Sequence, residues 1–207
     1  MSNIQSQISN LQSQLESAYP PDEALALAWW IAEELSGLSR TQLLCGCKDT
    51  TFLANTQAII ERLLHFEPIQ YIFGHTLWCG LDLKVTPDTL IPRPETAELV
   101  EKIINYQLPI TNACVLDVGT GSGCIAIALK KAHPEWQVTG IDISPEAIEV
   151  ARENARRNNV EVDFRVADIF GEMTNDKSPI TNNKYDIVVS NPPYICESEK
   201  VSMNPMF

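Results

Sequence analysis

Residues 113–129 constrain the fold most strongly, because they join two apolar runs through a glycine-rich turn. Residues 113–118 predict a buried parallel strand, and residues 124–129 predict the start of a helix. Between them, residues 119–123 read Gly-Thr-Gly-Ser-Gly, and their glycines allow positive φ and close approach of a ligand. Tight packing alone would also explain such a turn. The unit predicts a nucleotide-binding βα element with the spacing G-x-G-x-G rather than G-x-G-x-x-G.

Acidic residues stand near the carboxyl ends of the predicted strands. Asp117 could meet an ammonium group, while the N-terminus of the following helix favours an anion such as the carboxylate of S-adenosylmethionine. Residues 137–142 predict the next strand, whose last residue, Asp142, lies 19 positions after Gly123 and could accept from both ribose hydroxyls. Asp142 could equally help Ser144-Pro145 to start the next helix.

A third strand is predicted over residues 162–166, and a carboxylate again follows it. Asp168 could accept from the adenine amino group, with Ile169 or Phe170 against the ring, although a surface position for Asp168 fits the pattern equally well. The alternation of strands and helices from residue 113 onward predicts a doubly wound parallel sheet of the Rossmann-like α/β class.

The stretch Asn191-Pro192-Pro193-Tyr194 follows a fourth predicted strand over residues 185–190. Neither proline can donate a ladder hydrogen bond, so strand pairing must stop there. The Asn191 side-chain oxygen and the Pro192 carbonyl are two acceptors that suit an –NH2 group on a planar system, on which Tyr194 can stack. A strand that simply ends in a proline turn is the alternative. We predict catalytic roles for Asn191, Pro192 and Tyr194.

Together these motifs resemble the class I S-adenosylmethionine-dependent methyltransferases that act on planar amino or amide nitrogens. Residues 67–74 (Glu-Pro-Ile-Gln-Tyr-Ile-Phe-Gly) and residues 90–96 (Leu-Ile-Pro-Arg-Pro-Glu-Thr) resemble the signatures of the release-factor glutamine methyltransferases (PrmC/HemK). The resemblance runs from about residue 10 to the end of the chain. It implies methylation of N5 of the glutamine in the Gly-Gly-Gln motif of peptide chain release factors.

The motifs and the resemblance imply a set of site residues. The cofactor S-adenosylmethionine would be held by Asp117, Gly119, Thr120, Gly121, Ser122, Gly123, Asp142, Asp168, Ile169 and Asn191. The substrate glutamine would be held by Asn191, Pro192, Pro193, Tyr194 and Arg93. No metal is expected, because the six cysteines form no C-x-x-C pair and no His or Cys lies near Cys45-Gly46-Cys47 to complete a site.

The chain is predicted to have three parts. Residues 1–66 show helical spacing of apolar residues and predict a small bundle, to which the resemblance assigns binding of the substrate protein. Residues 67–94 predict an extended linker with a β-hairpin, because prolines and glycines punctuate an alternating stretch. Residues 95–207 predict a C-terminally incomplete catalytic domain, since class I sheets normally have seven strands. We expect a fragment whose fourth strand is an exposed apolar edge.

Composition narrows the function classes. The net charge of −12 argues against direct nucleic-acid binding, which needs clustered Lys and Arg. The sequence has no apolar run of about 18 residues, so no membrane span is predicted. The cysteines are interpreted as reduced thiols, which favours a cytoplasmic protein. Three alternatives stay open. They are a DNA adenine or ribosomal RNA guanine methyltransferase, a non-catalytic interaction fragment, and an NAD-dependent enzyme, which fits Asp142 but not the glycine spacing.

Overall fold

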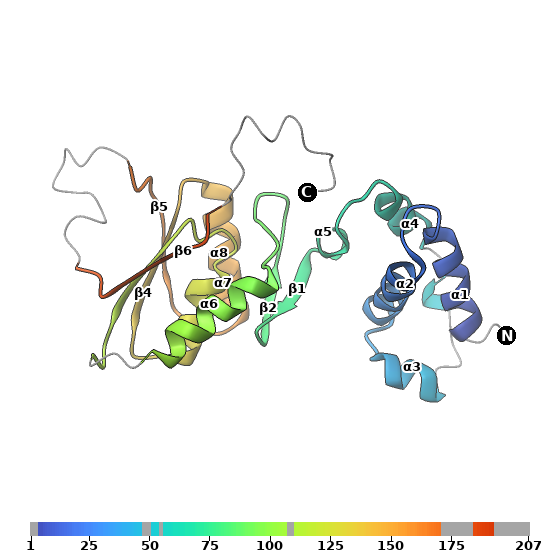
Figure 1. Ribbon diagram of the computed structural model, residues 1–207, viewed down its shortest axis with the longest axis horizontal. Helices are drawn as coiled ribbons and strands as arrows, with labels where there is room; N and C mark the ends of the chain where they lie inside the picture. The colour runs from blue at the N-terminus through green and yellow to red at the C-terminus, as the bar shows by residue number, and fades with distance from the viewer. Residues whose placement is uncertain (1–3, 47–50, 54–55, 107–109, 171–183, 193–207) are drawn as a thin grey trace. The chain divides into compact units, whose positions relative to one another are not determined.

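The computed structural model describes residues 4–46, 51–53, 56–106, 110–170 and 184–192 (Figure 1). They form two compact units that divide between Phe73 and Gly74. The first unit is helical, and the second is built on a parallel sheet. Among the described residues, no helix combines the length and the apolar composition that a membrane span requires.

The first unit is the predicted helical bundle. Its helices are α1 (Ile4–Leu15), α2 (Pro21–Ser36), α3 (Arg40–Gly46), the 3-10 turn η1 (Thr51–Leu53), α4 (Gln57–Leu64) and α5 (Ile69–Phe73). The apolar residues of α1 recur at spacings of three and four, and all of them are buried. Helix α2 begins with Pro21 in its first turn and ends at Gly37, whose φ of 65° is left-handed.

The segment after the bundle differs from the predicted extended linker. Residues 69–73 form helix α5, which belongs to the first unit, because the Pro68 carbonyl accepts from the Tyr71 amide at 2.9 Å and Ile69 is buried. Gly74, with φ of 76°, ends this helix. Pro68 and Gly74 therefore flank a short helix, although the sequence alone predicts that they interrupt an extended linker.

The predicted hairpin is confirmed and belongs to the second unit. Strands β1 (His75–Trp78) and β2 (Leu81–Lys84) pair antiparallel. Cys79 and Gly80 join them with φ of 49° and 70°, as a two-residue turn with two left-handed residues requires.

The second unit has a parallel four-stranded sheet with the order β5-β4-β3-β6. Its strands are β3 (Cys114–Val118), β4 (Gln137–Asp142), β5 (Asp163–Val166) and β6 (Ile187–Ser190), and its helices are α6 (Pro94–Asn105), α7 (Cys124–Ala132) and α8 (Pro145–Arg157). Val115, Val138, Phe164 and Val189 point from the four strands into one core with α7 and α8. This arrangement confirms the predicted Rossmann-like α/β class (Figure 1).

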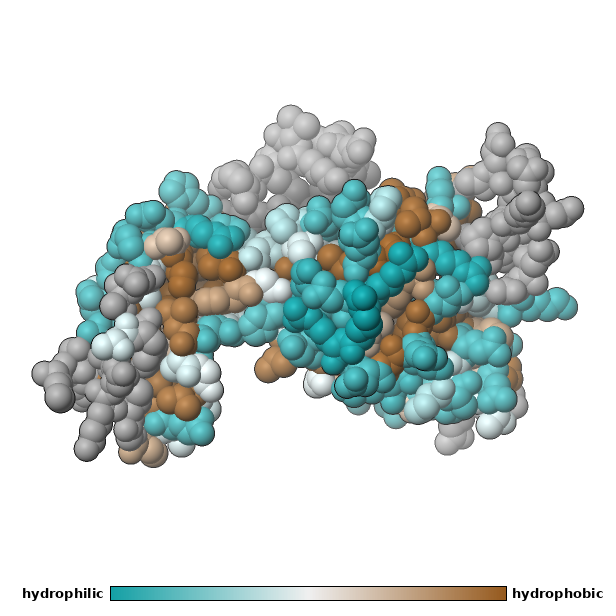
Figure 2. Space-filling model, turned by 180° about the vertical axis from the view of Figure 1, so that it is seen from behind, coloured by the Kyte–Doolittle hydropathy of each residue, from teal (hydrophilic) through white to brown (hydrophobic). Residues whose placement is uncertain are grey.

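Strand β6 is the last strand on its side of the described sheet, and its apolar edge is exposed. Side chains alternate between the faces of a strand, so Val189 is buried in the core while Val188 is 62% exposed. Brown apolar patches are visible on the surface of Figure 2, and the exposed large hydrophobic residues include Leu44, Phe66 and Val188. In the described sheet β6 is therefore an edge strand with one apolar side chain exposed on its outer face.

Asn154 of α8 ties the hairpin to the glycine turn. Its Oδ1 accepts from the Lys84 amide at 2.6 Å, and its Nδ2 donates to the carbonyls of Lys84 and Ser122 at 3.0 and 2.9 Å. The side chain is fully buried, so all these partners would lose their hydrogen bonds without access to water. Asn154 therefore holds three segments together that are distant in sequence.

We expect Asn154→Ala to lower the free energy of unfolding of the second unit by about 2–4 kcal/mol, because it leaves buried backbone groups unpaired. Asn158→Ala is the matched control. Asn158 also bonds the hairpin, with its Nδ2 donating to the Asp82 carbonyl at 2.8 Å, but it is half-buried, and water can replace it. Urea unfolding and hydrogen exchange at the Lys84 amide measure the difference. Equal losses for both variants would contradict the role given to Asn154.

Candidate active site

The register of the sheet brings the carboxyl ends of all four strands together. Val118 of β3 pairs with Ile141 of β4 on one side and with Ser190 of β6 on the other. Chain order advances from β3 through β4 to β5, whereas β6 lies on the opposite side of β3. The strand order therefore reverses between the paired strands β3 and β6. Ligands of open α/β sheets bind at such a point, outside the carboxyl ends of the strands.

The glycines of the turn have two different roles. Gly119, Gly121 and Gly123 all have positive φ, at 68°, 53° and 79°. A Cβ built on Gly119 or Gly121 meets nothing within 4 Å, so these two present open backbone to a ligand. A Cβ on Gly123 would lie 2.9 Å from the Phe164 ring, so this glycine serves close packing between helix and sheet. Close packing therefore explains Gly123, whereas contact of Gly119 and Gly121 with a ligand stays a prediction that their open Cβ positions permit.

The two polar side chains of the turn face the protein. The hydroxyls of Thr120 and Ser122 belong to buried residues, and Thr120 donates to Asp117 Oδ2 at 2.7 Å. The Thr120 amide donates to the Ile141 carbonyl at 2.9 Å, which anchors the turn on β4. Any contact of these two residues with a cofactor must therefore come from their backbone, which is a narrower role than the sequence implies.

Asp117 is a fully buried carboxylate beneath the turn. Its Oδ2 accepts from Thr120, and its Oδ1 has no hydrogen-bond partner among the described residues. Burial raises the pKa of Asp117 from its ordinary 3.8 to about 6. The hydrogen bond from Thr120 and the nearby backbone amide of Ala126 oppose this rise, and the negative charge of Asp142 adds to it. Because the carboxylate is fully buried, it would attract a cationic group such as the ammonium of S-adenosylmethionine through its negative charge, without direct contact.

We expect Asp117→Asn to stabilise the cofactor-free protein increasingly as the pH rises from 4 to 7. The pKa of Asp117 is higher in the folded than in the unfolded state, so the folded state binds the extra proton between these values and loses stability as it dissociates. Above pH 6 the wild-type protein has lost about 3 kcal/mol of its free energy of unfolding through this ionisation. Thermal unfolding of both proteins across this range measures it, and a difference independent of pH would contradict it. Cofactor affinity should fall in the same variant.

Asp142 connects β4 to the glycine turn. Its Oδ2 accepts from the Gly121 amide at 2.9 Å, and its Oδ1 accepts from the Ser144 amide at 3.1 Å. Ser144 in turn caps α8, because its hydroxyl accepts from the Ala147 amide at 3.0 Å. A carboxylate has about four acceptor positions, so capacity remains for ribose hydroxyls. Asp142 therefore helps the helix to start while staying suited to a ligand.

Apolar side chains stand exposed after β4 and β5. Ile143 follows Asp142 and is 72% exposed. Ile169 and Phe170 follow Asp168 and are 40% and 93% exposed. Asp168 is itself exposed, and its Oδ1 accepts from the Phe170 amide at 2.8 Å. Ile143 has no role predicted from the sequence, although a large apolar residue directly after a strand-ending acid is a usable signal. These side chains suit the faces of an adenine ring.

Asn191 lies beside the start of the glycine turn, because Ser190 pairs with Val118 and donates from its hydroxyl to the Val118 carbonyl at 2.8 Å. Its Nδ2 donates to the Thr96 hydroxyl of α6 at 2.9 Å. Pro192 follows on the surface, with its carbonyl one residue from the strand end. Pro193 and Tyr194, predicted to hold the substrate, lie outside the described residues.

Arg93 precedes α6 and is exposed. Its carbonyl accepts from the Thr96 amide at 3.1 Å and from Trp78 Nε1 at 3.0 Å, so its backbone belongs to the helix turn that reaches Asn191. The predicted substrate-binding Arg93 is therefore at the border of the site. Thr96 itself carried no predicted role, although it closes the Ile-Pro-Arg-Pro-Glu-Thr stretch that the sequence analysis singled out.

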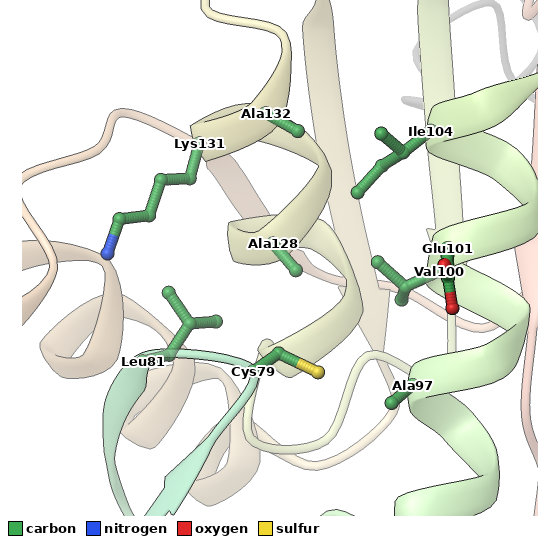
Figure 3. Close-up of a pocket in the computed structure, with 9 residues that line it drawn as sticks. All are labelled: Cys79, Leu81, Ala97, Val100, Glu101, Ile104, Ala128, Lys131 and Ala132. Carbon is green, nitrogen blue, oxygen red and sulfur yellow. The ribbon is translucent and has the colours of Figure 1, made fainter.

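A cavity of about 430 Å3 lies between the hairpin and helices α6 and α7 (Figure 3). Cys79 and Leu81 come from the hairpin, Val100 and Ile104 from α6, and Ala128 from α7. None of the predicted site residues lines this cavity. We therefore assign it no part in the reaction.

Comparison with known proteins identifies the relatives of this chain. Residues 8–74 match the PrmC N-terminal domain, and residues 111–204 match the family described as a methyltransferase domain. The chain is 42% identical over 197 residues to the release factor glutamine methyltransferase of Bacteroides thetaiotaomicron, covering 93% of this chain and 68% of the relative. It is 46% identical over 151 residues to that of Streptococcus pneumoniae, covering 72% of this chain and 51% of the relative.

Among solved structures, a methyltransferase from Pyrococcus furiosus is 25% identical, with 68% of this chain and 63% of that chain covered and a TM-score of 0.44. The chain spans from about half to two thirds of the length of the curated relatives it matches. Several curated relatives that cover most of this chain are all release factor glutamine methyltransferases. The chain belongs to the release factor glutamine methyltransferase family.

Proposed function

We propose that this protein transfers a methyl group from S-adenosylmethionine to N5 of the glutamine in the Gly-Gly-Gln motif of peptide chain release factors. The observation that carries the proposal is the placement of Asn191 beside the glycine turn, at the point where the strand order reverses. An amide oxygen at this position suits the recognition of a second amide. The names of the curated relatives support the same reaction.

The residues beneath the sheet edge fit the cofactor. Asp117 places a buried negative charge beneath the turn, which would attract an ammonium group. Asp142 offers remaining acceptor positions to hydroxyls, and Gly119 and Gly121 leave room along the backbone. Asp168 and the exposed Ile143 are the candidates for the adenine ring. When bound, S-adenosylmethionine supplies a methyl group on a positively charged sulfur.

The substrate nitrogen is a poor nucleophile, because its lone pair is delocalised over the amide. In the proposed mechanism the Asn191 Oδ1 and the Pro192 carbonyl accept hydrogen bonds from its two N–H groups and hold the nitrogen in line for attack. The new N–C bond would form as the S–C bond breaks, which would leave a neutral thioether, and the methylated nitrogen would lose one proton to solvent water. As the nitrogen becomes positive, both acceptors bind it more strongly, so they stabilise the transition state more than the ground state. Such positioning can contribute about 7–11 kcal/mol in favourable cases, and Tyr194 is proposed to cover the amide plane.

The helical unit is proposed to bind the release factor. A groove of about 420 Å3 on this unit is lined by Tyr19, Trp30 and Phe66 together with Glu23 and Glu67. Trp30 is half-buried there, whereas Trp29 is buried against Arg40, whose guanidinium lies 4.4 Å from its ring centre. Aromatic side chains with acidic neighbours suit an apolar and basic segment of a partner protein.

Mass spectrometry of a release factor incubated with this protein and S-adenosylmethionine tests the proposal. We expect a gain of about 14 Da on the glutamine of the Gly-Gly-Gln motif, and none on a release factor in which alanine replaces that glutamine. Parallel incubations with DNA and ribosomal RNA test the prediction that nucleic acid is no substrate. Methyl transfer to either nucleic acid but not to the release factor would refute the proposed substrate. Because release factors act on the ribosome, we also propose that the reaction takes place in the cytoplasm.

A further inference from the structure

We propose that Thr96 is a positioning residue, which orients the Asn191 amide for methyl transfer. The inference rests on the proposed function, since it assigns the orientation of the group that receives the substrate nitrogen. Asn191 Nδ2 donates to Thr96 Oγ1 at 2.9 Å, across a sequence separation of 95 residues. Thr96 is 5% exposed, and Asn191 is half-buried, so water competes little for this bond.

The orientation of this amide decides what it presents to a substrate. An asparagine amide carries an acceptor on one side and two N–H donors on the other. Because Nδ2 faces Thr96, Oδ1 is turned away from α6. A substrate –NH2 group needs an acceptor. If the Asn191 amide rotated by half a turn, its own N–H groups would face the N–H groups of the substrate. A bond that holds Nδ2 on α6 thus preserves the acceptor that the reaction needs.

Thr96 is itself held in place by the start of α6. Pro94 stands at the first helical position, where its fixed φ is suited to a helix. The Arg93 carbonyl accepts from the Thr96 amide at 3.1 Å and from the indole nitrogen of Trp78 at 3.0 Å. Trp78 is buried in the core from strand β1 of the hairpin. The hairpin, the first turn of α6 and Asn191 therefore form one hydrogen-bonded chain that ends at the site.

This series of hydrogen bonds gives residues 90–96 a role beyond connecting the two units of the protein. A connecting segment could use the prolines for stiffness but would need no hydroxyl at its end. A buried threonine whose oxygen accepts from a residue at the strand-order reversal is instead a contact directed at the site. Valine has the same shape without the acceptor, and serine keeps the acceptor without the methyl group. The two substitutions separate the hydrogen bond from packing.

The test compares Thr96→Val and Thr96→Ser with the wild-type protein. We expect Thr96→Val to lower kcat for release-factor methylation by about 10- to 100-fold, with the Kd of S-adenosylmethionine changed less than about threefold. Thr96→Ser should retain kcat within about threefold. The 1H–15N resonances of the Asn191 side-chain NH2 should shift in Thr96→Val and stay near their wild-type positions in Thr96→Ser.

Three results would overturn the inference: equal losses of kcat in both variants, a loss of cofactor affinity as large as the loss of kcat, or an Asn191 NH2 signal unchanged in Thr96→Val. If Thr96→Val does not fold, the wild-type spectrum decides. A hydrogen-bonded amide should show slowed exchange of one NH2 proton, and exchange as fast as in a free asparagine would refute the bond. The spectra also separate the two proposals. A wild-type protein that methylates no release factor refutes the function, while its Asn191 signal still reports the orientation.

Discussion

Asn191→Ala should lower the rate of methyl transfer to the release factor by about 100- to 1000-fold, the loss typical of removing one group that stabilises developing charge. The variant removes the acceptor proposed to hold the substrate nitrogen and leaves the glycine turn and the three acids proposed for the cofactor site unchanged. The Kd of S-adenosylmethionine should therefore change far less than kcat. Single-turnover methylation with saturating cofactor, together with calorimetry of cofactor binding, measures the two effects separately.

Ser190→Ala is the matched control for this variant. Ser190 precedes Asn191 on the same strand end, is exposed, and donates to the Val118 carbonyl at 2.8 Å. It contributes to the β3–β6 contact without being proposed to touch the substrate, so its loss should change kcat by only a few fold. An Asn191→Ala variant that loses cofactor affinity and kcat in equal measure would show that Asn191 acts mainly on the cofactor.

Gly121→Val should abolish the binding of S-adenosylmethionine. The Gly121 backbone has φ of 53°, and the position that a Cβ would take is open. The valine side chain would fill the space through which a ligand reaches the backbone of the turn. A branched side chain in a left-handed conformation also costs at least about 1–2 kcal/mol, so some loss of stability is expected in addition. Calorimetry with cofactor concentrations up to the millimolar range is the measurement.

Gly80→Val separates strain from obstruction. Gly80 has φ of 70°, its Cβ position is likewise free of neighbours within 4 Å, and it lies in the hairpin turn rather than in the glycine turn. It should show a similar decrease in melting temperature and normal cofactor affinity. If both variants lose the cofactor, general destabilisation rather than a blocked site explains the result.

Sequence reasoning succeeded where the signal is local. The apolar spacing of α1 and the strand–glycine turn–helix unit both depend on residues within a few positions of one another. Asp142 and Asn191 could be named because they end predicted strands. The same local reasoning was wrong at residues 69–73. From the sequence alone Pro68 and Gly74 indicate an extended linker, but they flank helix α5.

The amino-acid sequence by itself determined the α/β class, the glycine turn and the polar residues that follow each strand, because periodicity and backbone preference are properties of neighbouring residues. Tertiary structure alone decided that β6 lies beside β3, that Thr96 reaches Asn191 over 95 residues, and that Asn154 joins the hairpin to the turn. It also decided the raised pKa of Asp117, which needs complete burial. These features arise from packing between segments distant in the chain, and no local pattern encodes which segments will meet.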